Sequence, residues 1–243
     1  MRFSIAKAGS LLVAGVALTS AIGFSAAGTA SATVAPNATV SCGGSCTDIT
    51  SRVLGAGGLL NAYVPGDTGT GSKPGQLINI NQAANNHPNQ DFQIEPIGTV
   101  ASQCRSIVNP DGVLLSNSVL CIPGNGFLTH TAYEFDYAPF GNQTGLCTGT
   151  TGTPYNGMQV RLTSCGTTEG TLIVQGPDVT AGGATYNTYL SGATNTFSHP
   201  YVLSVNTSSS APGNLIQLQQ ENTSGAGVVN SNQLFALTTG PFS

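Results

Sequence analysis

One sequence pattern occurs twice in this chain, first near residue 75 and again near residue 213. Residues 75–80 (GQLINI) are followed by 89–94 (NQDFQI), and residues 213–218 (GNLIQL) by 232–237 (NQLFAL). Each copy has a strand in which apolar and polar residues alternate, then a polar loop, then a second strand opened by Asn-Gln. We infer that one supersecondary unit is used more than once in this fold.

A weaker third copy lies between these two, with Gly-Leu-Cys at 145–147, a Gly-led strand at 157–165 and an apolar strand at 171–174. Three such units predict a closed β architecture with a pseudo-threefold axis, because closure leaves no open strand edge. We expect this axis to relate one apolar residue from each unit, namely Phe92, Leu172 and Phe235.

The copies are unevenly spaced, and an insertion around residues 98–126 accounts for the excess between the first and the second. It contains Cys104 and Cys121 and is predicted to be a disulfide-tied loop. Nowhere does an apolar period of 3.6 residues persist through three turns, so we expect an all-β chain. The predicted strands are Leu59–Val64, Leu77–Asn81, Phe92–Ile97, Val113–Ile122, Tyr133–Tyr137, Met158–Leu162, Thr171–Gln175, Tyr201–Val205, Leu215–Gln219 and Leu234–Leu237.

Residues 1–32 are predicted to be a signal peptide. Arg2 and Lys7 form a short basic start, an apolar run covers 11–18, and Ala-Ser-Ala at 30–32 has the small-x-small form of a cleavage site. A membrane span is the competing interpretation, but polar residues interrupt the run. We therefore expect a secreted protein with no membrane span in its mature form, an N-terminal segment at 33–50 and one domain at 51–243.

The mature chain carries little charge and is acidic. Once Arg2 and Lys7 are removed with the signal peptide, four basic residues remain against 10 acidic ones. Proteins that bind nucleic acids need a basic surface to neutralise phosphates, so a nucleic-acid partner is not expected. The recurring runs of Val, Ile and Leu also argue against disorder, despite the high Gly and Ser content.

All six cysteines lie beyond the predicted signal peptide, which in an exported chain indicates disulfides. Six cysteines allow 15 pairings. We expect neighbours in sequence to pair, as Cys42–Cys46, Cys104–Cys121 and Cys147–Cys165. The Cys and His residues do not cluster at metal-ligand spacings, so neither a metal nor another cofactor is expected.

Several of these segments resemble the repeats of the ricin-type β-trefoil lectins. The resemblance rests on Gly-Leu-Cys at 145–147, Val-Arg-Leu-Thr-Ser-Cys at 160–165 and the two Asn-Gln-x-Phe phrases, and it spans roughly residues 50–240. It implies a β-trefoil that binds carbohydrate without catalysis. It also makes Cys147–Cys165 the firmest predicted disulfide, because cysteines of one repeat pair within that repeat in this family.

The sugar-site pattern of the family is only partly kept. Its aspartate position holds Asn61, Gly149 and Ser204, and its aromatic position holds Asn81, Thr163 and Gln219, in a chain without Trp. Without that platform, Tyr63 or Tyr201 would have to supply an aromatic face. The residues that the resemblance assigns to carbohydrate are Asn61, Asn79, Asn89, Gln90, Ser204, Gln217, Asn232 and Gln233.

A structural role competes with sugar binding for these residues, above all for Gln90 and Gln233 and the phenylalanines that follow them. The alternative function is therefore an extracellular structural or protein-interaction protein that keeps the scaffold and has lost its sugar sites. An enzyme is not expected. The three histidines are scattered, and Glu134 and Asp136, although about 7 Å apart along one strand face, lack an aromatic sugar clamp.

Overall fold

The computed structural model describes residues 46–63, 73–82, 88–104, 118–166, 168–207, 214–222 and 229–238. The predicted signal peptide at 1–32 and the predicted partner of Cys46, Cys42, lie outside these residues. No helix among the described residues is long and apolar enough to cross a membrane.

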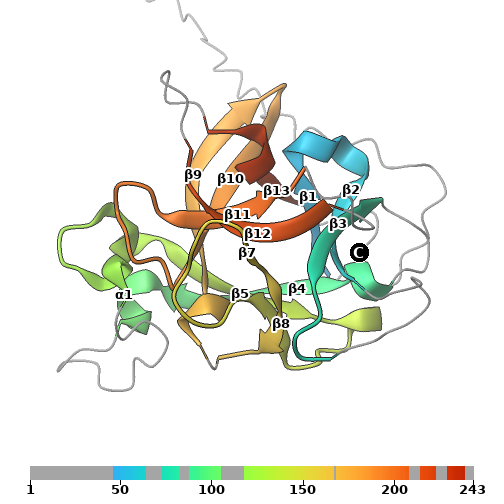
Figure 1. The fold of residues 1–243 in the computed structure, drawn as a ribbon, viewed down its shortest axis with the longest axis horizontal. Coiled ribbons are helices and arrows are strands. Elements are labelled where there is room, and N and C mark those ends of the chain that lie inside the picture. Colours follow the sequence, from blue (N-terminus) through green and yellow to red (C-terminus); the bar gives the residue numbers. More distant parts are fainter. Residues whose placement is uncertain are drawn as a thin grey trace, which may run out of the picture.

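Thirteen strands of the described chain form one connected sheet, arranged as three successive units (Figure 1). The first unit contains β1 (Asp48–Ser51), β2 (Gly58–Ala62), β3 (Ile78–Gln82) and β4 (Phe92–Thr99). The second contains β5 (Thr131–Tyr137), β6 (Leu146–Gly149), β7 (Met158–Gln159), β8 (Arg161–Ser164) and β9 (Ile173–Ala181). The third contains β10 (Ala184–Ser191), β11 (Tyr201–Val205), β12 (Asn214–Gln220) and β13 (Phe235–Thr238).

The outer strands of the three units close into a six-stranded barrel. The order β1–β13–β10–β9–β5–β4 is antiparallel throughout. The barrel closes between β4 and β1, where the Thr47 amide donates to the Phe92 carbonyl at 2.8 Å. Strand β1 begins within the predicted N-terminal segment at 33–50, and it is part of this barrel. Closure satisfies the backbone groups that an open edge would expose.

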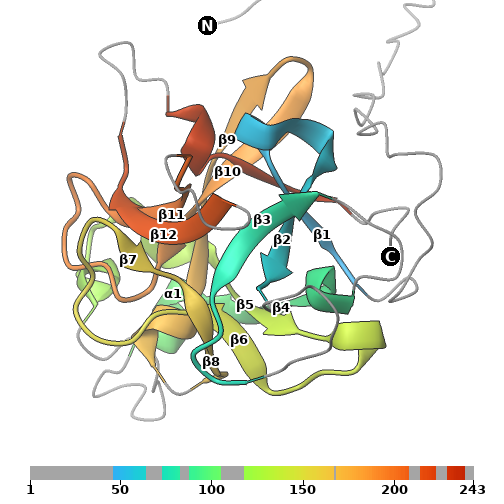
Figure 2. The ribbon, with the colours of Figure 1, turned by 45° about the vertical axis from the view of Figure 1, so that its right-hand side comes forward.

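The inner strands form three hairpins, β2–β3, β6–β8 and β11–β12, which cap one end of the barrel. The hairpins join around the pseudo-threefold axis (Figure 2). There the Ile78 amide donates to the Val160 carbonyl at 3.1 Å, and the Val160 amide donates to the Ile216 carbonyl at 3.0 Å. All three side chains are fully buried. A six-stranded barrel with three hairpins as its cap is a β-trefoil, as predicted.

Aromatic side chains fill the barrel. Phe135 lies edge-on to Tyr189, with ring centroids 5.5 Å apart, and Tyr189 lies 6.3 Å from Phe235. Phe92 packs on Tyr137 at 5.7 Å. These five side chains are fully buried. Edge-to-face aromatic pairs each contribute about 0.5–1.5 kcal/mol beyond the area they bury.

One expected equivalence is wrong by a single residue. Phe92, Ile173 and Phe235 each open a barrel strand after a short 3-10 turn, and all three belong to the main core. Leu172 instead packs in a second apolar cluster. Those turns are η3 (Pro88–Gln90), η7 (Glu169–Thr171) and η8 (Ser231–Gln233). In repeat two Thr171 stands where the other repeats have Gln90 and Gln233. Matching the repeats by their apolar residues therefore selected Leu172 instead of Ile173.

The predicted insertion lies between β4 and β5 and packs against the outside of the barrel in a second apolar cluster. It contains α1 (Val100–Gln103), η4 (Val119–Cys121) and η5 (Gly126–Thr129), and the Cys104–Cys121 disulfide is present as predicted. Val100 and Leu120 are buried in the second cluster against barrel residues such as Val174. The strand predicted at 113–122 is wrong in its described part, because Val119–Cys121 is a 3-10 turn.

Strands β9 and β10 form a long hairpin that projects away from the barrel (Figure 1), and the predicted strands include none of it beyond residue 175. Gly182 and Gly183 form its two-residue turn, both with positive φ, of 61° and 83°. Two consecutive residues with positive φ are what a type I′ hairpin turn requires, and glycine adopts them without steric cost.

Candidate ligand-binding cleft

The first group of predicted sugar residues lies inside the protein. In repeat one the Asn61 side-chain amide donates to the Asn79 side-chain oxygen at 2.8 Å, and both side chains are buried. Asn89 and Gln90 are buried as well, and Gln90 Nε2 donates to the Gln82 carbonyl at 2.9 Å. These amides therefore join neighbouring strands of the repeat, and any sugar contact through them stays a prediction.

Repeat three shows the same pattern with one partly exposed member. Asn232 donates to Ser204 Oγ at 3.1 Å and to the Val205 carbonyl at 3.3 Å, so these two predicted residues contact each other. Ser204, Gln217 and Gln233 are buried, and Asn232 is half-buried. None of the eight predicted residues lines either of the two clefts described below.

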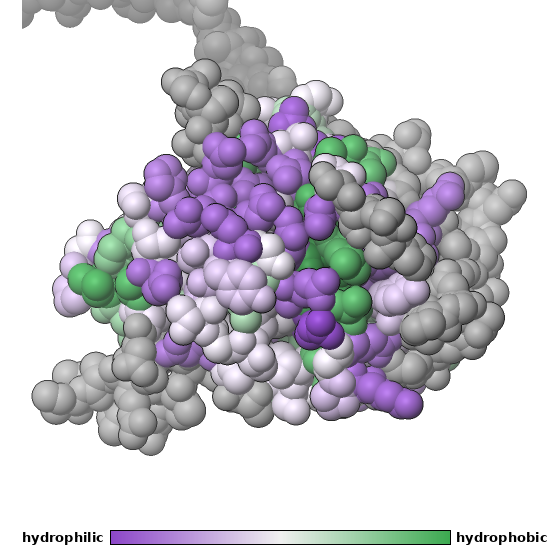
Figure 3. All heavy atoms as spheres, viewed as in Figure 1, coloured by the Kyte–Doolittle hydropathy of each residue, from purple (hydrophilic) through white to green (hydrophobic). Residues whose placement is uncertain are grey.

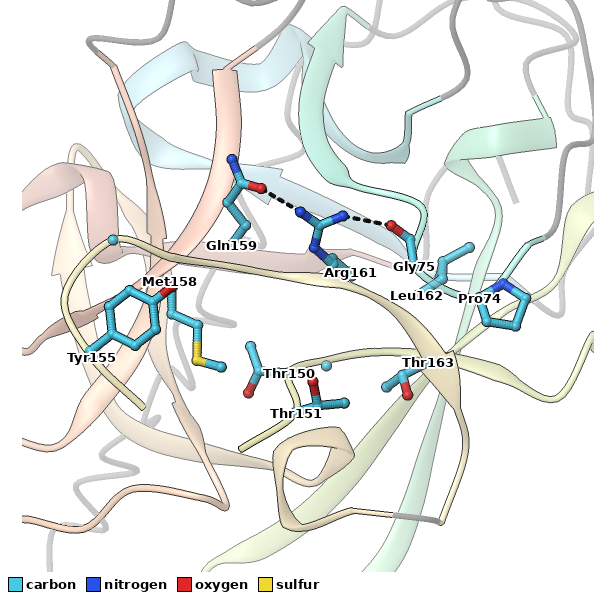
Figure 4. Close-up of a pocket in the computed structure, with 12 residues that line it drawn as sticks. Pro74, Gly75, Thr150, Thr151, Tyr155, Met158, Gln159, Arg161, Leu162 and Thr163 are labelled. Atoms are coloured by element: carbon cyan, nitrogen blue, oxygen red, sulfur yellow. Dashed lines mark hydrogen bonds between the residues drawn. The ribbon is translucent and has the colours of Figure 1, made fainter. Parts of the chain in front are cut away.

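A cleft of about 680 Å³ lies in repeat two (Figure 4). The end of β6, the following loop, strands β7 and β8, and the segment before β3 contribute to it. Its lining residues are Pro74, Gly75, Gly149, Thr150, Thr151, Tyr155, Gly157, Met158, Gln159, Arg161, Leu162 and Thr163. We call this the repeat-two cleft. Two of its members, Gly149 and Thr163, occupy the family's aspartate and aromatic positions.

Close backbone packing explains why no aspartate stands at residue 149. A Cβ atom added to Gly149 would lie 2.8 Å from the Gly170 carbonyl oxygen and 3.0 Å from Thr171 Cα. Gly170 is equally constrained, because its own Cβ would lie 2.1 Å from the Thr150 carbonyl oxygen. Real Cβ atoms do not approach backbone atoms this closely, so the strand end and η7 can pack only through glycines.

Tyr155 gives the repeat-two cleft an aromatic face. It is 60% exposed, which is the largest value among the exposed large hydrophobic residues of the described chain. Figure 4 shows its ring beside Met158, with Thr150, Thr151 and Thr163 arranged along the same side of the β7–β8 segment. An exposed ring beside several hydroxyl groups can contact both the apolar face and the hydroxyls of a small polar ligand.

Arg161 lies at the opposite edge and is held by neutral oxygens. Its Nη1 donates to the Gly75 carbonyl at 2.8 Å, and its Nη2 donates to Gln159 Oε1 at 2.7 Å (Figure 4). Residues 159 and 161 alternate with the buried Val160 and Leu162, so their side chains point outward from the strand. The backbone around residue 161 is also bridged to the segment before β3 through Leu77.

The predicted Cys147–Cys165 disulfide is present and joins the two strands that form the cleft. Its Cα atoms are 4.9 Å apart, and it connects β6 to the residue that follows β8. Cys46 is disulfide-bonded too. The described cysteines therefore contain no free thiol.

A second, smaller cleft of about 400 Å³ lies on the other side of the 150–157 loop. It is lined by Gly152, Thr153, Pro154, Thr168, Glu169, Gly170, Ala193, Thr194 and Asn195. Among the described residues that line it, Glu169 is the only charged one. Hydrophilic residues also gather on the face shown in Figure 3, over β11 and β12.

The two acids that the sequence places on one strand face lie on β5 in different environments. Glu134 Oε1 accepts hydrogen bonds from the Gly166 amide at 2.7 Å and from Thr171 Oγ1 at 3.2 Å. Asp136 is buried, and burial together with the charges of Glu95 and Glu134 raises its pKa to about 6. Glu134 also lies near Cys147 and Cys165, but those sulfur atoms form a disulfide and offer no thiolate to a metal.

Sequence reasoning missed the residues that give the cleft its chemistry. Tyr155 lies in a loop without a repeat pattern. Arg161 lies in the predicted strand Met158–Leu162, and no functional role was predicted for it. The recurrence of Gln159 and Arg161 with period two was the available signal, because alternate residues beside buried positions face outward.

No protein-family model matches this chain, and no curated protein matches it. Solved structures resemble it in fold. A designed 3-fold symmetric protein, ThreeFoil, aligns over 79% of this chain and 96% of its own, with 12% identity and a TM-score of 0.48. A mosquitocidal holotoxin aligns with 79% of this chain but only 17% of its own length, with 11% identity and a TM-score of 0.48.

The Haemophilus ducreyi cytolethal distending toxin aligns over 86% of this chain and 90% of its own, with 12% identity and a TM-score of 0.44. The strand pairing described above defines the β-trefoil without these similarities. The class of this protein is therefore a disulfide-linked β-trefoil with an open cleft in its second repeat.

Proposed function

We propose that this protein is a secreted carbohydrate-binding module without catalytic activity, and that sugar binds in the repeat-two cleft. The observation that carries the proposal is the exposed ring of Tyr155 beside a cleft lined by Thr150, Thr151 and Thr163. A sugar presents an apolar ring face and several hydroxyls, and a shallow site needs an aromatic surface for the first and short polar groups for the second.

The site predicted from the family pattern differs from this one. Seven of the eight predicted residues are buried, and the side-chain hydrogen bonds of Asn61, Gln90 and Gln233 connect them to neighbouring strands. Breaking such bonds would leave buried polar groups without partners, which costs about 1–3 kcal/mol for each group. The cleft in repeat two requires no such rearrangement.

A glycan array followed by titration calorimetry on the mature protein tests the proposal. We expect binding that weakens at least tenfold in Tyr155→Ala. The matched control is Phe140→Ala, because Phe140 is also an exposed aromatic, at 54%, and lines neither cleft. No binding to any glycan at millimolar sugar, or equal loss in both variants, would contradict the proposal.

Protein interaction is the second candidate function. The burial of the predicted sugar residues in repeats one and three favours it, because a scaffold that has lost those sites would show this. Cross-linking of the mature protein on intact cells, followed by mass spectrometry, tests it. Recovery of glycans without a reproducible protein partner would count against it.

Secretion is supported by the disulfides, since such bonds persist in oxidising compartments outside the cytosol. The intact mass of the protein recovered from culture medium tests the predicted cleavage after residue 32. A cell-retained protein that keeps residues 1–32 would contradict it.

A further inference from the structure

We propose that the ligand of the repeat-two cleft is an acidic saccharide, whose carboxylate or sulfate group pairs with Arg161. This inference rests on the proposed function and adds the chemical class of the ligand. It starts from the charge of the residues that line the cleft, which differs in sign from the net charge of the chain. The chain is acidic overall, yet among the described residues that line this cleft none is an Asp or a Glu, and one is Arg161.

The charge of Arg161 is not neutralised within the described chain. Both of its hydrogen bonds go to uncharged oxygens, the Gly75 carbonyl and the Gln159 side-chain amide. A guanidinium group has five N–H donors, so three remain for a ligand. Lys73, which is exposed, directly precedes the lining residues Pro74 and Gly75 in sequence.

The two hydrogen bonds also fix the orientation of the guanidinium plane. An arginine held in place loses less side-chain entropy when it binds, and its planar fork matches a carboxylate or another oxyanion with two parallel hydrogen bonds. A free surface arginine would not have this advantage. The Gly75 carbonyl and Gln159 therefore act as positioning groups for a charged contact at the edge of the cleft.

The neighbouring cleft provides an internal contrast. Among its described lining residues Glu169 is charged and none is basic, so charge favours an acidic sugar in the repeat-two cleft over this one. Charge thus predicts which of the two clefts an acidic polymer occupies.

Calorimetric titration of the mature, oxidised protein tests this inference with three probes of equal length: a uronic acid oligosaccharide, a sulfated oligosaccharide and a neutral glucan. We expect at least one acidic probe to bind ten times or more tightly than the neutral one, and to weaken as salt concentration rises. Arg161→Gln should remove this preference, and Arg161→Lys should restore only part of it, because lysine keeps the charge but not the fork.

The matched control is Arg52→Gln, which removes the same charge from an arginine that lies over the Tyr186 ring, 5.9 Å from its centroid. It should leave the preference for the acidic probe within twofold. Thermal unfolding of each variant shows whether it is folded. Equal binding of neutral and acidic probes, with Arg161→Gln unchanged, would overturn the inference and leave the proposed function standing. The absence of binding to all three probes and to the glycan array would overturn both.

Discussion

Gln90 and Gln233 make the same hydrogen bond in two different repeats. In each case Nε2 donates at 2.9 Å to the carbonyl of the residue that ends a hairpin strand, Gln82 in β3 and Gln220 in β12. Gln233 additionally accepts a hydrogen bond from the Asn222 amide at 2.9 Å. The Gln of the recurring Asn-Gln phrase therefore connects a hairpin of the cap to the turn before a barrel strand. We call this connection the lock.

Replacing Gln233 with Ala should destabilise the fold by about 1–3 kcal/mol, because the Gln220 carbonyl and the Asn222 amide would lose their buried partner. Urea unfolding followed by circular dichroism measures the change. Gln220→Ala is the control, since it removes an exposed side chain but keeps the carbonyl. A loss under about 0.5 kcal/mol in Gln233→Ala would show that the lock is unimportant.

Introducing the family's aspartate as Gly149→Asp should destabilise the protein and not create a sugar site. The new Cβ would lie 2.8 Å from the Gly170 carbonyl oxygen and 3.1 Å from Thr163 Cγ2. Overpacking of this kind costs about 1–3 kcal/mol. Thr151→Asp places the same carboxylate at an exposed neighbouring position and should leave the melting temperature nearly unchanged. A Gly149→Asp variant as stable as the parent would contradict this packing argument.

Removal of the Cys147–Cys165 disulfide, by replacing both cysteines with serine, should lower the unfolding free energy by about 2–4 kcal/mol. The bond joins β6 to the residue after β8, so carbohydrate binding at the cleft should weaken as well. The corresponding change at Cys104 and Cys121 lies in the insertion and should reduce stability without weakening binding. Equal binding losses in the two variants would argue against a local role of the first bond.

Stability should fall as the pH rises from about 4 to above 6. Burial and the nearby Asp91 raise the pKa of Asp48 from 3.8 to about 6, and Asp136 is raised to a similar value. Between these limits the folded state holds protons that the unfolded state has released, so the unfolding free energy decreases with increasing pH.

Asp48→Asn should reduce this slope and stabilise the protein at pH 7 by roughly 1–2 kcal/mol. Urea unfolding at several pH values measures it, with Glu221→Gln in the loop after β12 as the control. An unfolding free energy that rises with pH over this window would show that the Asp48 carboxyl is not held protonated in the folded state. A pH dependence that is unchanged in Asp48→Asn would show the same.

The sequence repeats predicted the fold correctly where the residues of one repeat pack against one another. Apolar alternation and the Asn-Gln phrases predicted the trefoil, and neighbouring cysteines predicted two of the bonds found. The same reasoning failed at Leu172, because repeat two replaces the locking glutamine with Thr171 and the apolar residue that enters the barrel is Ile173. It also missed most of the β9–β10 hairpin, which has little apolar periodicity beyond residue 175.

By itself the sequence determined the threefold β class and the pairing of Cys104 with Cys121 and of Cys147 with Cys165. These depend on local periodicity and on contacts within single repeats or the insertion. Only the tertiary structure decided which polar residues are accessible, because burial depends on how separate repeats close around one axis. That closure encloses Asn61 and Ser204 within repeats one and three, and leaves Tyr155 and Arg161 exposed beside an open cleft in repeat two.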